Sequence, residues 1–581
     1  FFGVLNGVAK VAVFVVLLIA VLLIIGLFQG DGLPKTMVLA LDLRNTIADS
    51  ASTNYAFGAA PVTVLDTVLA LDGAERDARV KGVFLKIGSG ELSIAQAEEL
   101  GAALKKFRKS GKFVVADAIG FESASLGDYL TAASADQIWM QPRAPFMAAG
   151  FAGGEIFLRG LFDKIQANPQ IVKRADYKSA ADMYMEKEMT PSDHEQLTRL
   201  MQAWYDNATQ GAAADRHIDS KAMIAAFEAS PQLSEDVLAK RLIDRIGYDD
   251  EAQGAALGRA GDGAKFVAMS RYIGVRKQTA EMGTGARIAV IPAAGEIKDG
   301  TSSGGGVFGG DSGIAGDDLA RAIRQAAADS SIKAIILRVD SPGGSVTASD
   351  QILHAVKMAQ AGGKPVVVSM GSLAASGGYY ISLSANRIVA EPGTITGSIG
   401  VLTGKVSFDR TAALAGIGTG LVGVGRGATF NTPFQPYTPD QLAALNHQAD
   451  VIYADFTQKV AAGRHLPLAQ VQDIAKGRVW SGADAQTHGL VDQLGGFWTA
   501  TDIARKLAGI DASTPLVFKM FPHQKNLYEA VSALFGNSDQ SVSAVRAFVT
   551  LMNAAPVKAV VQTVADLPKG GIELRATNLP R

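Results

Sequence analysis

The chain has 581 residues, no cysteine and a formal net charge of −1, with 19% charged and 48% apolar residues. One hydrophobic core does not organise a chain of this length, so we expect two or more domains. The lack of cysteine excludes disulfides, a thiol nucleophile and cysteine-bound metal, and the near-neutral charge offers no basic field for nucleic acid.

The first predicted element is a membrane anchor. Residues 11–28 form an uncharged apolar run of 18 residues. At 1.5 Å per residue, such a helix crosses most of a hydrocarbon core that is about 30 Å thick. Residues 29–35 contain no small-residue cleavage motif of the kind that ends a signal peptide. We therefore expect an uncleaved single-pass helix within residues 1–33.

The rest of the sequence repeats one plan after about 250 residues. Residues 79–87 parallel 331–339, and residues 111–116 parallel 363–368. Each is an apolar, β-branched run typical of a buried strand, and helical segments lie between them. Strands that alternate with helices form right-handed βαβ units, so the sequence predicts an α/β fold with largely parallel sheets.

A repeat of this length indicates duplicated domains rather than a solenoid. We expect an N-terminal domain over residues 34–285, a C-terminal domain over 286–520 and a helical extension over 521–581. Residues 300–316 are rich in glycine, but they lack the Gly-Lys-Ser/Thr ending of a P-loop and the G-x-G-x-x-G spacing. They are typical of a connector.

Two Gly-rich turns of the C-terminal half supply complementary parts of an acyl-transfer site. Ser376 follows the predicted strand 365–369, and the Pro-Gly-Gly turn within residues 340–345 follows the predicted strand 332–339. A serine at a strand-to-helix turn exposes its hydroxyl. A Pro-Gly-Gly turn after a parallel strand leaves outward N–H groups, as an oxyanion hole requires. Ordinary βα turns are also rich in glycine, so these residues alone leave an unspecialised α/β domain open.

The two halves differ where the chemistry would be. Ser125 occupies the place of Ser376 in the N-terminal half, but residues 88–91 lack the Pro-Gly-Gly turn. The N-terminal half contains Lys178, whereas the corresponding residues 423–430 contain no lysine. This division indicates one composite site that the halves share, and it leaves Ser125 without an oxyanion turn.

A serine nucleophile needs a base within hydrogen-bond reach. The histidines are scattered, and none adjoins a Gly-rich turn, so each is interpreted as a surface or packing residue: His194, His217, His354, His447, His465, His488 and His523. A triad partner that meets the serine only in the fold stays open. Lysine is an alternative base, because burial disfavours its charged form and lowers its pKa. The complementary loss between the halves favours Lys178.

These motifs resemble those of the signal peptide peptidase A (protease IV) family, in its long, tandem-domain, membrane-anchored form. The resemblance covers essentially the whole chain. It rests on a combination of four segments: 177–180, 340–345, 370–380 and 394–400. It implies two tandem domains similar to ClpP and the crotonases, and a serine–lysine peptidase without a cofactor or metal.

Carried over by motif, the resemblance implies that Ser376 is the nucleophile and Lys178 the general base. Ser398 looks like the hydroxyl that orients the lysine amine. The implied oxyanion hole consists of backbone N–H groups near three glycines: Gly343, Gly344 and Gly377.

The resemblance also implies a substrate and a setting. The expected substrates are signal peptides released from preproteins and similar apolar peptides. The expected assembly is a homotetramer at the bacterial inner (cytoplasmic) membrane, held by the N-terminal helix, with the catalytic body in the periplasm. No nucleic-acid partner is expected.

Two other interpretations of these residues stay open. A crotonase-like acyl-CoA enzyme shares the fold and the backbone oxyanion hole, but it needs catalytic carboxylates near the turns. A catalytically inactive membrane scaffold is the other, because the N-terminal half has lost part of its site. Such a scaffold would have lost activity while keeping Ser376, Ser398, Lys178 and the oxyanion turn.

Overall fold

The computed structural model describes residues 31–50, 62–90, 92–122, 126–280, 283–302, 313–425 and 427–522. The predicted anchor over residues 11–28, Ser125, most of the glycine-rich connector and the extension after residue 522 lie outside these ranges. No helix within the described ranges is both long and apolar enough to cross a membrane.

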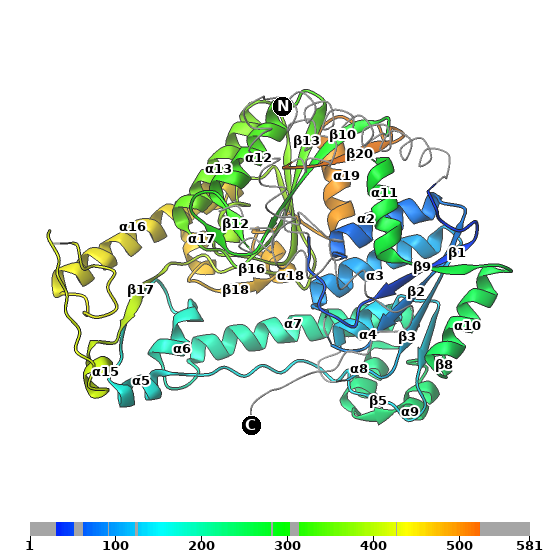
Figure 1. The fold of residues 1–581 in the computed structure, drawn as a ribbon, viewed down its shortest axis with the longest axis horizontal. Helices are drawn as coiled ribbons and strands as arrows, with labels where there is room; N and C mark the ends of the chain where they lie inside the picture. Colours follow the sequence, from blue (N-terminus) through cyan, green and yellow to red (C-terminus); the bar gives the residue numbers. More distant parts are fainter. Residues whose placement is uncertain are drawn as a thin grey trace, which may run out of the picture. The chain divides into compact units, whose positions relative to one another are not determined.

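The N-terminal half forms a parallel sheet of order β8-β4-β3-β2-β1-β9 (Figure 1). Its strands are β1 (Met37–Asp42), β2 (Val80–Ile87), β3 (Phe113–Ala118), β4 (Gln137–Met140), β8 (Arg245–Ile246) and β9 (Lys265–Ala268). Outside this sheet lie β5 (Pro145–Phe146), its antiparallel partner β7 (Gln232–Leu233), and β6 (Asn168–Lys173). The helices are α2 (Val64–Arg76), α3 (Ile94–Lys109), α4 (Leu126–Ala133), α5 (Arg159–Ile165), the 3₁₀ turn η1 (Ser179–Ala181), α6 (Asp182–Met185), α7 (Pro191–Arg216), α8 (Ser220–Glu228), α9 (Ser234–Ala239), α10 (Asp249–Ala260) and α11 (Met269–Ala280).

The C-terminal half repeats this plan in a sheet of order β18-β16-β14-β13-β10-β20, with β15 and β19 joined through β14. Its strands are β10 (Ala286–Ala294), β13 (Ile332–Ser341), β14 (Val366–Ala375), β15 (Arg387–Ala390), β16 (Ile395–Gly397), β18 (Val479–Ser481), β19 (Gln493–Leu494) and β20 (Leu516–Met520). The remaining strands are β11 (Ile297–Lys298), β12 (Ile314–Ala315) and β17 (Leu402–Ser407). The helices are α12 (Gly316–Ala328), α13 (Val346–Ala361), α14 (Gly377–Tyr380), α15 (Asp409–Leu414), α16 (Pro439–Arg464), α17 (Leu468–Ile474), α18 (Gly482–Thr487) and α19 (Phe497–Leu507).

The prediction of parallel sheets in both halves is confirmed, but the strand before Ser376 is longer than expected. The apolar run ends at residue 369, whereas β14 continues to Ala375. The extension forms because Leu373–Ala375 pair with β16, after a register irregularity between β13 and β14. The strand therefore ends directly at Ser376.

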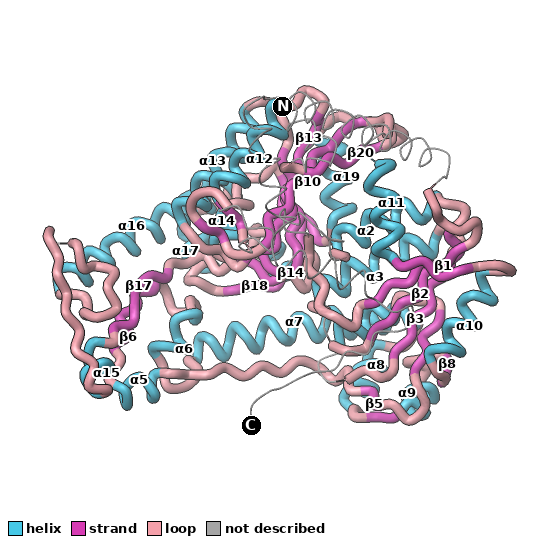
Figure 2. The backbone as a smooth tube through the Cα atoms, viewed as in Figure 1, coloured by secondary structure: helices cyan, strands magenta, loops and turns pink. Residues whose placement is uncertain are grey.

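The duplication is visible in α7 and α16, the longest helices of the described residues, with 26 residues each. Each begins with a threonine cap followed by proline at the first helical position, which suits a helix start. Each ends at a histidine in the left-handed conformation, His217 at φ 54° and His465 at φ 55°. Figure 2 shows both helices as long cyan tubes.

The duplication also sets the register near Ser376. The Tyr129 hydroxyl donates to the Leu242 carbonyl at 2.9 Å, and the Tyr379 hydroxyl donates to the Leu490 carbonyl at 3.0 Å. Tyr129 is thus equivalent to Tyr379, which sets residue 126 opposite Ser376. The sequence repeat alone aligns Ser125 with Ser376, one residue away. It differs because the alignment of the repeat does not include the tyrosine hydrogen bonds.

Helices cover both faces of each sheet. Helix α10 packs on one face of the first sheet, and α12 and α13 pack on one face of the second (Figure 1). Between the sheets, α3 contacts β14, and α19 contacts β13 and β14. One hydrophobic cluster includes Leu85 of the first sheet, Ile336 of the second sheet and Phe497 of α19, which lies between them. The halves therefore share a core.

An antiparallel pair outside the main sheets also joins the halves. Strand β6 of the N-terminal half pairs with β17 of the C-terminal half along its length, from Asn168 opposite Ser407 to Lys173 opposite Leu402. The residues after β6 and those before β17 consequently lie side by side. Lys178 is in the first segment, and Ser398 is in the second.

Candidate active site

Ser376 lies at the junction between β14 and α14. Its backbone has φ 54° and ψ −117°, a conformation that a non-glycine residue adopts only at a local energetic cost. The Ser376 N–H donates to the Gly397 carbonyl of β16 at 2.9 Å, and its carbonyl accepts from the Tyr380 N–H. These bonds hold the residue at a sharp strand-to-helix turn.

The Pro-Gly-Gly turn after β13 packs directly against Ser376. A Cβ atom built on Gly343 would lie 2.5 Å from the Gly377 nitrogen and 2.9 Å from the Ser376 Cβ. One built on Gly344 would lie 2.1 Å from the Ile297 carbonyl oxygen. Both glycines have positive φ, 104° and 145°. Only glycine satisfies both the space and the backbone conformation.

The three glycine N–H groups are not equivalent. The Gly343 N–H donates to the Ser341 hydroxyl at 3.2 Å. Within the described residues, the N–H groups of Gly344 and Gly377 donate to no other group. A Cβ atom on Gly377 would lie 3.1 Å from the Gly344 nitrogen, so the two unpaired donors are neighbours beside Ser376. Such a pair of backbone donors can hold a developing oxyanion.

Lys178 reaches this turn from the N-terminal half. Its Nζ lies 3.1 Å from Ser376 Oγ, 2.8 Å from Ser398 Oγ and 3.2 Å from the Ser398 carbonyl oxygen. The side chain is only 7% exposed. Burial lowers the pKa of Lys178 to about 8, because an apolar setting disfavours the ammonium ion. A substantial fraction of the amine is then neutral near pH 8.

Two glycines of the C-terminal half make room for the lysine. A Cβ atom on Gly477, whose φ is 74°, would lie 2.6 Å from the Lys178 Cβ, and one on Gly400 would lie 3.2 Å from its Cδ. The Tyr177 N–H also donates to the Lys476 carbonyl at 3.1 Å. The lysine backbone is therefore docked on the half that carries the serines.

A small cavity of about 20 Å³ opens beside Ser376. Its lining is mostly small and apolar: Gly344, Val346, Ser349, Ser376, Gly377, Tyr380, Gly400, Ile452 and Phe456. A lining of this kind suits an apolar side chain.

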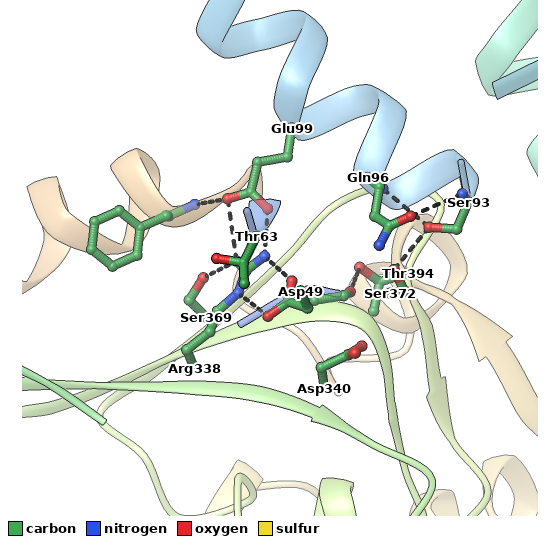
Figure 3. Close-up of polar contacts among 12 residues, drawn as sticks. Asp49, Thr63, Ser93, Gln96, Glu99, Arg338, Asp340, Ser369, Ser372 and Thr394 are labelled. Carbon is green, nitrogen blue, oxygen red and sulfur yellow. Dashed lines mark hydrogen bonds and ion pairs between the residues drawn. The ribbon is translucent and has the colours of Figure 1, made fainter. Parts of the chain in front are cut away.

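A buried polar junction holds the site strands to the N-terminal half (Figure 3). Arg338 of β13 is 1% exposed. Its Nε donates to Asp49 at 2.9 Å, and its guanidinium also donates to Glu99 and to Ser369 of β14. A buried charge requires such partners. The ends of β13 and β14 carry the oxyanion turn and Ser376, so the junction ties both to the half that supplies Lys178.

The corresponding turn of the N-terminal half is already filled. Asp128 is fully buried, and its carboxylate accepts the N–H groups of Gly88 and Gly90 at 2.9 Å each and that of Leu92 at 3.3 Å. The turn donors that follow β2 are thus already satisfied by the Asp128 side chain. Ser125 itself lies outside the described residues.

Within the described residues, no histidine forms a hydrogen bond to Ser376. His217 and His465 end helices, and the His488 ring packs on Trp480 with 4.3 Å between ring centroids. His523 lies outside the described residues. No group of three or more carboxylate or imidazole side chains in the described part of the chain is arranged to hold a metal ion.

The structure brings together all six residues singled out from the sequence: Lys178, Gly343, Gly344, Ser376, Gly377 and Ser398. Sequence reasoning missed Gly400, Gly477 and the Arg338 junction. Gly400 stands two residues after Ser398, inside a segment already noted. Arg338 is a charged residue within an apolar run, and such a residue in a buried strand signals a buried partner.

Family models and individual proteins match this chain. The model for peptidase family S49 matches residues 106–261 and 358–511, together more than half of the chain, and that for Clp protease matches 316–391. Protease 4 of Salmonella typhi is 33% identical over 498 residues, which cover 81% of this chain and 78% of that protein. The chloroplastic serine protease SPPA of Arabidopsis thaliana is 32% identical, over 82% of this chain and 70% of that protein. Protease 4 of Haemophilus influenzae is 31% identical, over 77% and 73%.

Proposed function

This chain belongs to peptidase family S49, a family of serine peptidases, and we propose that it cleaves apolar peptides with Ser376 as nucleophile and Lys178 as general base. The observation that carries the proposal is the position of the Lys178 Nζ, 3.1 Å from Ser376 Oγ and 2.8 Å from Ser398 Oγ. A buried amine is a competent base only when it is neutral.

Acylation follows from these positions. Neutral Lys178 takes the proton of the Ser376 hydroxyl while Oγ attacks the peptide carbonyl carbon. The carbonyl oxygen becomes an oxyanion and accepts the N–H groups of Gly344 and Gly377. The lysine ammonium then gives its proton to the leaving amine as the C–N bond breaks. The Ser398 hydroxyl and carbonyl hold the amine toward Ser376 throughout.

Deacylation uses the same groups. A water molecule gives a proton to neutral Lys178 and attacks the acyl-enzyme carbonyl. The second oxyanion collapses, the bond to Ser376 Oγ breaks, and the lysine returns the proton to the serine. The cycle needs no metal and no cofactor.

The proposed substrates are signal peptides released from preproteins and similar apolar peptides. The small apolar cavity beside Ser376 supports this choice. We propose that the apolar run over residues 11–28 anchors the protein in the bacterial inner membrane, with the catalytic body in the periplasm, and that the protein forms a homotetramer. Protease accessibility in spheroplasts and native mass in detergent test these points separately from activity.

Two rival functions make different predictions. A crotonase-like acyl-CoA enzyme needs a free carboxylate beside the oxyanion turn. Asp340 is the carboxylate in that turn, and it accepts the Leu373 N–H at 3.0 Å, so it serves the backbone. An inactive scaffold would bind apolar peptides without cutting them.

The deciding experiment is the cleavage of a fluorogenic apolar signal-peptide fragment by wild type, Ser376→Ala and Lys178→Ala. Circular dichroism and native mass check that each variant folds and assembles. We expect both variants to lose at least about a thousandfold in kcat/KM, as when a nucleophile or its base is removed. Near-normal activity of Lys178→Ala would refute the lysine base. Binding without cleavage by wild type would favour the scaffold.

A further inference from the structure

The lysine that serves as base in the proposed function lies in the irregular residues between β6 and the short turn η1, which leads directly into the four-residue helix α6. Such a segment does not fix a side chain by its own hydrogen bonds. Its position must come from what packs on it. Two consecutive residues near the start of α7, Glu195 and Gln196, contact both this segment and the C-terminal half.

Gln196 makes the inner contacts. It is 2% exposed. Its side-chain NH₂ donates to the Tyr177 carbonyl at 3.1 Å and to the Ser179 hydroxyl at 3.0 Å, the residues on either side of Lys178. It also lies 2.8 Å from Asp193 Oδ1, on the preceding helical turn. The amide thus bonds the residue on each side of the lysine, through the backbone of Tyr177 and the side chain of Ser179.

The other end of the same amide holds the C-terminal half. The Val479 N–H donates to Gln196 Oε1 at 3.2 Å. Val479 lies in β18 and pairs with Gly397 of β16, the residue before Ser398. One side chain therefore connects the lysine segment to the strand pair that carries the Ser398 hydroxyl.

Glu195 makes the outer contacts. Its carboxylate accepts the Tyr177 hydroxyl at 2.8 Å and the Arg478 guanidinium at 2.7 Å. The Arg478 guanidinium lies 4.8 Å from the Tyr177 ring centroid. The Glu195 side chain is exposed, so solvent weakens its ion pair with Arg478. The buried Gln196 amide is the stronger constraint.

We propose that Gln196 is a positioning residue for Lys178, which fixes the amine between Ser376 and Ser398 by bonding both neighbours of the lysine and the strand beside Ser398. This inference rests on the proposed function. It goes beyond it by assigning to α7, a helix remote in sequence from the serine, control over the geometry of the base.

The pH dependence of the reaction reports this role. Lys178 is in contact with two serine hydroxyls, and burial is what lowers its pKa. The charged side chains around its segment include two ion pairs, Lys173 with Asp182 and Arg478 with Glu195. They also include Glu155, whose pKa is raised to about 7 by burial and by its hydrogen bond with Asp193. Asp193 accepts from Gln196, and Lys476 lies near Asp473 on the C-terminal side. If Lys178 loses its fixed place and gains solvent, its pKa rises toward the ordinary value.

The test compares Gln196→Met with wild type. Methionine keeps the size and helix preference of glutamine without its hydrogen bonds or a charge. The matched control is Gln202→Met, a change at an exposed position of the same helix, where the glutamine side chain donates to Asp206 and to no other described residue. The measurements are kcat/KM against pH, and the rate at which a fluorophosphonate probe labels Ser376 against pH.

We expect Gln196→Met to lower kcat/KM at pH 7 by about 10- to 100-fold, the effect of a small misplacement of a catalytic group. The pH at which activity falls on the acidic side should also be higher than in wild type, by about half a unit or more, in both pH profiles. Gln202→Met should coincide with wild type. If the Gln196→Met variant folds and its activity falls at the same acidic pH as that of wild type, the inference is overturned.

Two further arms keep the test decisive. If Gln196→Met does not fold, Ser179→Ala serves instead, because it removes one acceptor of the same amide. It should shift the acidic side of the pH profile in the same direction by a smaller amount. A coincident profile for Ser179→Ala then overturns the inference. Lys178→Ala separates the two levels: if it is fully active, the proposed function fails, and if it is inactive while the Gln196 profile is unchanged, only the positioning role fails.

Discussion

At the scale of single residues, the protonation state of Lys178 controls the proposed chemistry. Burial lowers the pKa of Lys178 to about 8, and only the neutral amine accepts the serine proton. We expect kcat/KM to rise with pH, through a midpoint near this value, and to be lost at lower pH. Stopped assays from pH 5 to 10 with a non-ionising substrate measure this pH dependence of kcat/KM. A midpoint at pH 6 to 7, removed by a histidine substitution, would assign the base to that histidine.

The oxyanion turn gives a second prediction at this scale, for Gly343→Ala. The new Cβ would stand 2.5 Å from the Gly377 nitrogen, at a backbone φ of 104°. The turn must shift and displace the oxyanion donors, so we expect a loss in kcat of at least about 100-fold. Active-site titration with the fluorophosphonate probe separates this loss from misfolding.

The matched control for that change is Gly363→Ala. Gly363 also has a positive φ, 83°, but a Cβ there meets no atom within 4 Å. It carries similar backbone strain without the clash. We expect the control to lose some stability and to keep near-normal kcat. Equal losses of kcat in both variants would show that strain, rather than the turn geometry, is responsible.

At the scale of elements, apolar patterning and turn chemistry were enough to predict β2, β3, β13, the first part of β14 and the two Gly-rich turns. These signals are local. Runs of β-branched residues predict the strands β2, β13 and β14, and glycines in the turns predict positions with positive φ. Contacts between distant segments were not accessible in the same way. The bonds from Gln196 to Tyr177 and to Val479 join parts of the chain that only packing brings together, and no spacing encodes them.

The duplicated turns explain why one half can be active and the other not. In the C-terminal half the N–H groups of Gly344 and Gly377 face Ser376. In the N-terminal half the Asp128 carboxylate already accepts the N–H groups of Gly88 and Gly90. Because these N–H groups already have an acceptor, they are not free to stabilise an oxyanion.

We therefore expect Ser125→Ala to retain most activity, within about twofold of wild type in kcat/KM, since surface or non-catalytic changes have small effects. The same fluorogenic assay measures it, with Ser376→Ala as the reference for complete loss. A loss comparable to that of Ser376→Ala would mean that Ser125 is a second nucleophile, and that the Asp128 arrangement does not silence the N-terminal half.

At the scale of the whole molecule, the composite site depends on how the halves dock. The junction around Arg338 contains more carboxylates than cations. Asp49 and Glu99 pair with Arg338, and Glu391 is buried nearby, where burial and the charges of Glu99 and Glu98 raise its pKa. Burial also raises the pKa of Asp340 to about 6. The docked state therefore holds protons that the unfolded chain releases.

Glu98 gives the last prediction. It lies on α3, and its carboxylate accepts the Gly393 N–H of the C-terminal half at 2.8 Å. Burial raises the pKa of Glu98 to about 8, well above that of an exposed glutamate. A raised carboxylate pKa contributes stability that is complete below the unfolded pKa near 4.3 and is lost as pH rises toward 8. The wild-type protein should therefore lose stability over the same pH range in which the Lys178 amine becomes neutral and cleavage activity rises.

Glu98→Gln keeps an oxygen acceptor for Gly393 and cannot ionise. We expect its free energy of unfolding to match that of wild type near pH 4.5 and to exceed it at pH 8 by on the order of 1 kcal/mol or more. Urea unfolding at several pH values measures this difference, with the exposed Glu188→Gln as control. Parallel curves for wild type and Glu98→Gln would mean that Glu98 is already ionised in the docked protein. A divergence would show that the halves are held most firmly at a pH where the lysine is still protonated, so that the pH optimum of peptide cleavage reflects docking as well as the base.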